Sequence, residues 1–203
     1  SMSVWKDVDG ILNADPKVFP DAVQIAELNY LDTIELAYSG AQIIHPKTIK
    51  PLQNKNIPLY VRPFGDKRKP GTVIRRMSAP IEVPILILKK DQVLLTIRSR
   101  DFSFVLEEKF AAIFSLLERY RIKVNLVHNS AVNLSLCVDN SWHIDEAIQA
   151  LRNEEFDVMK VENMELLTIR GYNGDLMERY ASGPEVFLLQ RTQSTARIVR
   201  KNR

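Results

Sequence analysis

A short internal repeat constrains the fold of this chain more than any other feature of its sequence. The segment LLTIR occurs at residues 94–98 and again at residues 166–170. Each copy lies in a run rich in apolar and β-branched residues, a composition typical of a buried strand. The two copies therefore predict two related units, each built around a strand of this sequence.

The elements around the first copy follow the order of a known α/β arrangement. Hydrophobic periodicity predicts a strand, a helix, two strands, a helix and a strand, at residues 92–99, 104–120, 123–128, 132–139, 143–154 and 156–161. This is the order of a ferredoxin-like α/β sandwich. Along 132–139 apolar and polar residues alternate, so one apolar face is expected to meet helices. That face consists of Val132, Leu134, Leu136 and Val138.

The unit around the second copy is incomplete. After the strand at 164–172, the sequence predicts a short helix at 174–181 and strands at 185–191 and 194–201, with no second helix. A further apolar strand at 83–88 could complete the second sheet, which would make the first unit an insertion in the second. The expected domains are therefore 91–162, and 83–90 together with 163–203.

Residues 1–74 have a different pattern and are expected to form a separate α/β domain, joined to the rest by a linker at 75–82. The sequence predicts a helix over 30–39 that ends at Gly40, and a second over 45–56 interrupted by Pro51. Strands are expected at 57–63 and 71–74. His45, alone and followed by proline at a helix start, is expected to cap or pack rather than to catalyse.

The stretch VWKDVDGILNADPKVFPDA begins like a strand at Val4 and continues as an acidic loop. A calcium loop that starts at Asp7 would need an oxygen ligand at its fifth position and glycine at its sixth, but the fifth position is Ile11 and Gly10 falls at the fourth, so this loop is not an EF-hand. Asp7 and Asp9 could share a strand face, but nothing nearby suggests a proton to move. A nucleotide-binding loop and a solvated turn remain as alternatives.

Composition excludes several classes of protein. The 203 residues include 45% hydrophobic and 26% charged residues, enough for a sizeable core, and no apolar run approaches the ~20 residues of a membrane span. The formal charge of +3 is concentrated in short runs, which argues against a nucleic-acid-binding domain. The single cysteine, Cys137, excludes an internal disulfide, fits a cytoplasmic protein and is expected to be buried and inert. The histidines and Cys137 do not form a recognisable metal-ligand set.

Three segments carry a resemblance to one enzyme family. DVDGILNADPKVFPDA, ELAYSGAQIIHPKTIKPLQNKNIPLYVR and PGTVI resemble the carboxy-terminal third of the catalytic domain of aspartokinases. The tandem units after residue 80 resemble the regulatory ACT domains of that family. The resemblance implies an α/β fold in which the tail of an amino-acid-kinase domain is followed by two ferredoxin-like ACT units, the second incomplete. The amino-terminal phosphate-binding motif of the family does not occur in this sequence, so the chain resembles a carboxy-terminal fragment.

The resemblance gives the acidic loop a role in nucleotide binding. It implies nucleotide contacts at Lys6, Asp7, Leu12, Lys17 and Gln42. Asp7 would accept hydrogen bonds from the ribose or base, and Lys17 would meet phosphate. Family members often have threonine, tyrosine and lysine at the positions of Lys6, Leu12 and Gln42. This chain therefore lacks a stacking ring and one cationic contact at these positions.

The resemblance also implies a site for an amino-acid effector, formed by one domain and the second strand of a partner domain. Backbone N–H groups at a helix start would bind the α-carboxylate, and Ser99 or Asp101 the α-ammonium. The effector side chain would face a neutral wall, where lysine-sensitive relatives usually have acidic residues at Asn125 and Ala131. That wall favours threonine or another neutral amino acid, although backbone carbonyls could still hold lysine. The implied residues are Ser99, Asp101, Ser103, Phe104, Val105, Asn125, Asn129 and Ser130.

The resemblance implies that the parent enzyme transfers the γ-phosphoryl group of ATP, bound with magnesium, to the side-chain carboxylate of L-aspartate. This fragment alone is expected to bind no nucleotide cofactor and no metal, to contain no catalytic residue, and to lack kinase activity. Its expected partners are an amino-acid effector and a second copy, bound through the ACT domains, with no nucleic acid and no membrane. A stand-alone amino-acid-binding regulatory protein is the alternative.

Overall fold

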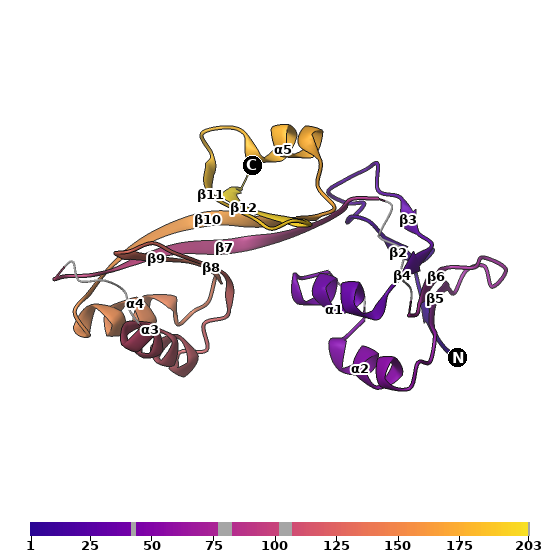
Figure 1. Ribbon diagram of the computed structural model, residues 1–203, viewed down its shortest axis with the longest axis horizontal. Helices are drawn as coiled ribbons and strands as arrows, with labels where there is room; N and C mark the ends of the chain where they lie inside the picture. Colours follow the sequence, from indigo (N-terminus) through magenta and orange to yellow (C-terminus); the bar gives the residue numbers. More distant parts are fainter. Residues whose placement is uncertain (42–43, 77–82, 102–106, 203) are drawn as a thin grey trace. The chain divides into compact units, whose positions relative to one another are not determined.

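The computed structural model describes residues 1–41, 44–76, 83–101 and 107–202 (Figure 1). The chain divides into two compact units. Unit 1 comprises Ser1–Leu88, Leu167–Arg179 and Arg191–Ala196, and unit 2 comprises Lys89–Leu166, Tyr180–Gln190 and Arg197–Arg203. The fold is mixed α/β, as expected.

Unit 1 contains a four-stranded sheet in the order β1-β5-β6-β4. β1 and β5 are parallel, β5 and β6 are antiparallel, and a two-stranded ribbon of β2 and β3 lies apart from this sheet. The core of the unit joins this sheet to both helices, with Leu28, Leu36 and Ile49 almost fully buried. The elements are β1 (Met2–Lys6), β2 (Ile11–Leu12), β3 (Gln24–Ile25), β4 (Glu27–Leu28), α1 (Tyr30–Tyr38), α2 (Pro46–Asn54), β5 (Leu59–Pro63) and β6 (Thr72–Ile74).

Side chains cap both helices of unit 1. The Asn29 side chain accepts a hydrogen bond from the backbone N–H of Asp32 at 2.6 Å, which satisfies one of the free donors at the start of α1. His45 does the same for α2, because its Nδ1 accepts from the N–H of Lys47 at 3.1 Å. The expectation that His45 caps a helix is confirmed. α2 continues through Pro51, which the sequence predicted to interrupt it.

A second sheet has six strands in the order β11-β12-β10-β7-β9-β8. Helices α3 and α4 cover one face of its β7–β9 part, where Leu134, Leu136 and Val138 of β9 lie in the core (Figure 1). These three residues were predicted to face helices. The elements are β7 (Ile85–Ser99), α3 (Glu107–Arg119), β8 (Val124–Asn129), β9 (Asn133–Asp139), α4 (Ile144–Asn153), β10 (Phe156–Arg170), α5 (Gly174–Ala181), β11 (Val186–Arg191) and β12 (Thr195–Lys201).

The strands β7 and β10 are each longer than the sequence predicted. We expected separate strands at 83–88 and 92–99, and at 156–161 and 164–172, but each pair is one continuous strand. Each contains one residue in the left-handed region, Asp91 with φ 53° and Asn163 with φ 58°. Asp91 accepts a hydrogen bond from the N–H of Asn140, and Asn163 from that of Asn202. In each strand a backbone hydrogen bond therefore fixes the left-handed residue, and the strand continues beyond it.

The left-handed residue in β10 changes which face of the sheet a side chain occupies. Residues two apart along a regular strand lie on the same face. Phe156 and Val158 nevertheless pack with the core under α3 and α4, whereas Met164 and Leu166 pack in a different cluster with Leu126, Cys137, Leu188 and Val199. Both faces of the sheet in unit 2 therefore carry apolar clusters. Cys137 of β9, which alternates with the apolar face of that strand, is buried in the second cluster.

Candidate nucleotide and effector sites

Two of the nucleotide-contact residues implied by the sequence, Lys6 and Asp7, lie at one edge of the unit 1 sheet. Lys6 ends β1 and pairs in register with Pro63, which ends the parallel strand β5. Since parallel neighbours end at the same edge, the loops that follow them begin side by side. The N–H of Phe64 donates to the carbonyl of Lys6 at 2.7 Å. Asp7 follows directly and is exposed.

The other predicted contacts lie nearby in sequence but in different local settings. Leu12 is half-buried in the ribbon, opposite Gln24 of β3. Lys17 is exposed in a turn, where its N–H donates to Asp15 Oδ1 at 2.9 Å. Gln42 lies outside the described residues. The structure therefore brings Lys6 and Asp7 to the sheet edge and leaves the contact role of all five positions a prediction.

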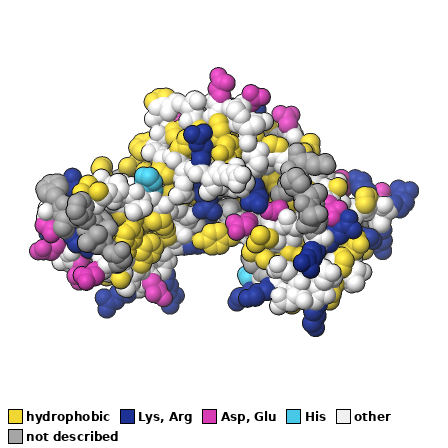
Figure 2. Space-filling model, viewed as in Figure 1, with side chains coloured by type: hydrophobic (Ala, Val, Ile, Leu, Met, Phe, Trp, Pro, Cys, Tyr) yellow, Lys and Arg dark blue, Asp and Glu magenta, His cyan; other side chains and the backbone are white. Residues whose placement is uncertain are grey.

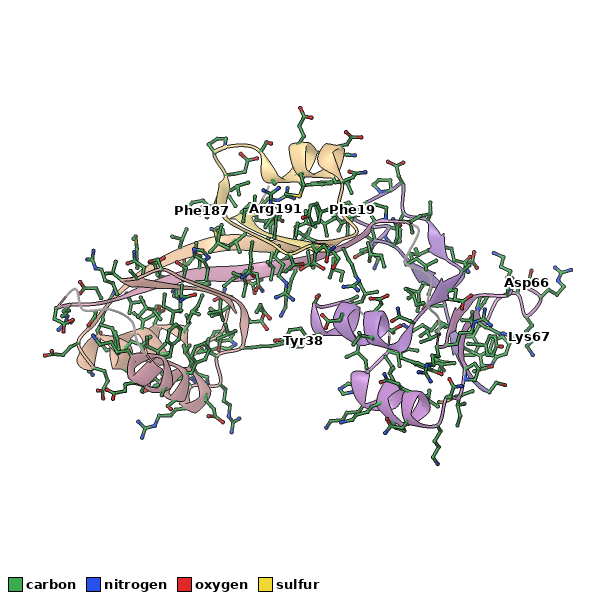
Figure 3. The ribbon with its side chains drawn as sticks, viewed as in Figure 1. Phe19, Tyr38, Asp66, Lys67, Phe187 and Arg191 are labelled. Carbon is green, nitrogen blue, oxygen red and sulfur yellow. The ribbon has the colours of Figure 1, made fainter. Side chains whose placement is uncertain are left out.

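Sequence reasoning missed a second loop at this edge, residues 64–70 between β5 and β6. Lys69 Nζ lies 2.6 Å from Asp9 Oδ2, which ties this loop to the acidic loop. Lys and Arg side chains gather over this end of unit 1 in Figure 2, and Figure 3 marks Asp66 and Lys67 in the loop. The basic run GDKRKPG was the only sequence signal, because pairing of Asp9 with a residue 60 positions away depends on the sheet.

The same loop presents an aromatic ring beside the predicted nucleotide contacts. Phe64 is 67% exposed, and its ring centroid lies 6.4 Å from that of Trp5. The loop turns back tightly at Gly71, where φ is 70° and a Cβ atom would lie 2.0 Å from the carbonyl oxygen of Val61. Only glycine fits this close approach. Exposed aromatic and cationic groups of this kind can stack on a base and attract phosphate.

The first predicted effector segment is at the end of β7 and the start of α3. Ser99 is buried, and its hydroxyl donates to Asp101 Oδ1 at 2.6 Å. Lys109 Nζ of α3 lies 2.6 Å from Ser99 Oγ and 3.5 Å from Asp101 Oδ1. Ser103, Phe104 and Val105 lie outside the described residues, so their predicted role as backbone donors stays a prediction. Ser99 and Asp101 are together, as expected, with a lysine that the sequence did not point to.

The second predicted segment contains Asn125, Asn129 and Ser130. Ser130 closes the turn between β8 and β9, because its hydroxyl accepts from the N–H of Asn133 at 3.2 Å. Asn129 is exposed at the end of β8, paired with Leu134. Asn125 lies at a register shift between Val124 and Leu126, four residues earlier or roughly 13 Å along the strand. Within one chain, the segment therefore spans most of β8.

Asn125 belongs to a hydrogen-bonded cluster in unit 2. Its Nδ2 donates to Gln92 Oε1 and Asp139 Oδ1, both at 2.7 Å, and its Oδ1 accepts from Lys89 Nζ at 2.8 Å. Lys89 Nζ also lies 2.6 Å from Asp139 Oδ1. Gln92 is 1% exposed and donates to the same carboxylate at 2.9 Å. The amide of Asn125 is thus engaged by its own chain.

The cluster controls the ionisation of two neighbouring groups. Burial alone would raise the pKa of Asp139, but hydrogen bonds from Lys89, Gln92 and Asn125 outweigh it, and the pKa of this carboxyl is lowered from 3.8. Burial, followed by the charge of Asp139, raises the pKa of Cys137 to about 12. Cys137 is therefore a thiol at neutral pH, as the sequence suggested.

The described residues contain no group of three or more His, Cys, Asp or Glu side chains that could hold a metal ion. Within the same residues, no helix has the length and apolar character required to cross a membrane.

Comparisons with known proteins identify the relatives of this chain. A model of the amino acid kinase family matches residues 1–63. Aspartokinase 3 of Arabidopsis thaliana chloroplasts is 37% identical over 147 residues, which are 69% of this chain and 25% of that protein. Lysine-sensitive aspartokinase 3 of Escherichia coli is 31% identical over 194 residues, 92% of this chain and 42% of that protein. The chain belongs to the aspartokinase family.

The structural comparison agrees with the sequence comparison. The crystal structure of Escherichia coli aspartokinase III in complex with lysine and aspartate superposes with a TM-score of 0.75 at 26% identity, over 97% of this chain and 47% of that one. This aspartokinase chain therefore has the fold of the end of an amino-acid-kinase domain and of ferredoxin-like ACT units. It spans between 25% and 42% of the length of the two curated relatives.

Proposed function

We propose that this chain is the regulatory region of an aspartokinase, and that it binds an amino-acid effector and forms a dimer. The identity of 31% over 92% of the chain to a protein named lysine-sensitive aspartokinase 3 supports this proposal. The effector would be held by segments at the end of β7, at the start of α3 and along β8. Lys109, Ser99 and Asp101 provide a charged and hydroxyl-bearing group there.

The whole protein would phosphorylate the side-chain carboxylate of L-aspartate with ATP, in the biosynthesis of lysine, threonine and methionine. ATP would supply the phosphoryl group, with magnesium bound mainly through its phosphates. Asp7 and Lys17 are exposed and would be accessible to the nucleotide, and Lys6 lies at the carboxyl edge of the sheet. In the whole protein these residues would help to position the nucleotide, a contribution that matters because phosphoryl transfer depends on positioning and on charge neutralisation.

Thermal melting of this chain tests the effector proposal. We would add threonine, lysine, methionine or magnesium-ATP, one at a time and at millimolar concentration. A ligand that binds only the folded state adds about 2.7 kcal/mol of stability at a hundredfold its dissociation constant. We expect threonine to raise the midpoint and magnesium-ATP to leave it unchanged. A chain whose midpoint responds to no amino acid would contradict the proposal.

A further inference from the structure

The wall around Asn125 already contains a bound ammonium group. Lys89 Nζ contacts Asn125 Oδ1 at 2.8 Å and Asp139 Oδ1 at 2.6 Å, and the Lys89 side chain is only 21% exposed. A carboxylate and an amide oxygen are the acceptors that a protein would offer to a cationic ligand at this place. Here the protein's own lysine has taken both acceptors.

The charges near Asn125 add to this effect. Arg197 of β12 donates from its guanidinium to the carbonyl oxygen of Asn125, at 3.4 Å. Two cations, Lys89 and Arg197, therefore contact groups around Asn125, against one carboxylate, Asp139. Lys89, Gln92 and Asn125 all contact this carboxylate, and their hydrogen bonds lower the pKa of Asp139. A third cation at this wall would be repelled by Lys89 and Arg197, and it would find Asn125 Oδ1 and Asp139 Oδ1 already engaged by Lys89.

The network also makes this arrangement difficult to change by a rotation of side chains. The two N–H groups of Asn125 are both donated inside the cluster, to Gln92 and Asp139. Gln92 donates to the carbonyl of Lys90 as well as to Asp139, and it is almost fully buried. Displacing Lys89 would leave Asp139 half-buried without its cation, a state that costs free energy.

We propose that Lys89 makes the effector site selective for amino acids with a neutral side chain and excludes those with a cationic side chain. This inference rests on the proposed function, because it concerns the side-chain end of the proposed effector site. Lys89 acts as a specificity-determining residue: its ammonium occupies the position that the charged end of a longer effector would need. Neutral side chains with a hydroxyl group or no polar group are accepted.

Isothermal titration calorimetry on the full chain tests this inference with three probes. L-threonine is the small neutral probe, L-lysine the cationic one, and L-norleucine has the length of lysine without its ammonium. The variant Lys89→Met removes the ammonium and frees Asp139, and Lys89→Gln is a second variant that keeps a hydrogen-bond donor. Lys90→Met is the matched control, because Lys90 is adjacent and exposed. Circular dichroism establishes that each variant is folded.

In the original chain we expect a neutral amino acid to bind at least about tenfold more tightly than lysine. Lys89→Met should tighten lysine binding at least about tenfold and change binding of the neutral probes less than about threefold. Lys90→Met should behave as the original chain does.

Three results would overturn the inference. The first is lysine binding to the original chain as tightly as the neutral probes. The second is a folded Lys89→Met or Lys89→Gln variant that binds a neutral probe but gains no affinity for lysine, and this would leave the proposed function standing. The third is no binding of any probe to any variant, which would remove the effector site itself and the proposed function with it.

Discussion

At the scale of single residues, the two copies of the repeat differ in the side chain buried at one equivalent position. In the first copy, Val93 precedes LLTIR and faces Val138 across the sheet, under α3 and α4. In the second copy, the corresponding residue is Glu165, which forms a buried ion pair with Arg200 at 2.7 Å. Arg200 also lies over the ring of Tyr180 in α5. In the second copy α5 takes the place of the two helices α3 and α4, and the Glu165–Arg200 ion pair occupies the position of the apolar pair.

Breaking this ion pair by one substitution should be costly, whereas replacing both partners should not. Glu165→Gln or Arg200→Met should each lower the free energy of unfolding by about 3 kcal/mol or more, because the remaining charge is buried alone. The double variant Glu165→Val with Arg200→Val reproduces the first copy and should lie within about 1 kcal/mol of the original chain. Urea unfolding monitored by circular dichroism measures these differences. Equal losses in the single and double variants would contradict the argument.

Cys137 should be unreactive in the folded chain. Its side chain is fully buried, so a reagent cannot reach the sulfur. Burial also raises the pKa of the Cys137 thiol to about 12, so the reactive thiolate does not form at neutral pH. We expect one thiol to react with a disulfide reagent in denaturant and none in native buffer at pH 7. Because this pKa is higher in the folded chain than the ordinary thiol value of 9.0, the thiol makes a contribution to stability that is fully present below pH 9.0. This contribution should be lost as the pH rises toward 12. Rapid labelling of the native chain would contradict this prediction.

At the scale of elements, the long strands show how one residue can redirect a whole segment. Asn163 adopts φ 58°, and the alternation of faces shifts there by one residue: Phe156 and Val158 before it pack in one cluster, whereas Met164 and Leu166 after it pack in the other. Asparagine tolerates this conformation, glycine prefers it, and a β-branched residue is strained in it. The strand can therefore serve both ferredoxin-like units without a break.

Substitution of Asn163 should follow backbone preference rather than strand propensity. Asn163→Val should cost about 1–2 kcal/mol of stability, although valine is a better strand former, and Asn163→Gly should cost much less. Met159→Val is the control, because Met159 is exposed in the same strand without a positive φ. Denaturant midpoints give the comparison. The prediction is wrong if valine is tolerated equally well at both positions.

At the scale of the whole molecule, the six-stranded sheet has two edges, β8 and β11. Edge strands offer unpaired backbone groups that a second chain can use. Val127 of β8 is 38% exposed, and Phe187 and Leu189 are exposed on β11. An edge with exposed apolar side chains suits the dimer that we propose, in which one copy would cover the edge of another.

We expect the dimer to use β8, because the proposed effector wall lies on that strand. Val127→Lys should convert the dimer into a monomer in sedimentation velocity at micromolar concentration, because it places a charge in an apolar interface. Leu189→Lys on β11 is the matched control and should leave the dimer intact. The reverse pattern would assign the interface to β11, and a monomeric original chain would rule out the dimer.

The sequence by itself determined the family and the positions of the helices and of the strands around the LLTIR repeats. The repeated LLTIR strands, the alternation in β9 and the amphipathic helices are local patterns, and local patterns determine secondary structure where they agree with burial. The tertiary structure alone decided that β7 and β10 are continuous, that Lys69 meets Asp9, and that Lys89 occupies the wall at Asn125. The contacts of Lys69 and Lys89 join residues 60 and 36 positions apart, and only a folded sheet brings them within a hydrogen bond.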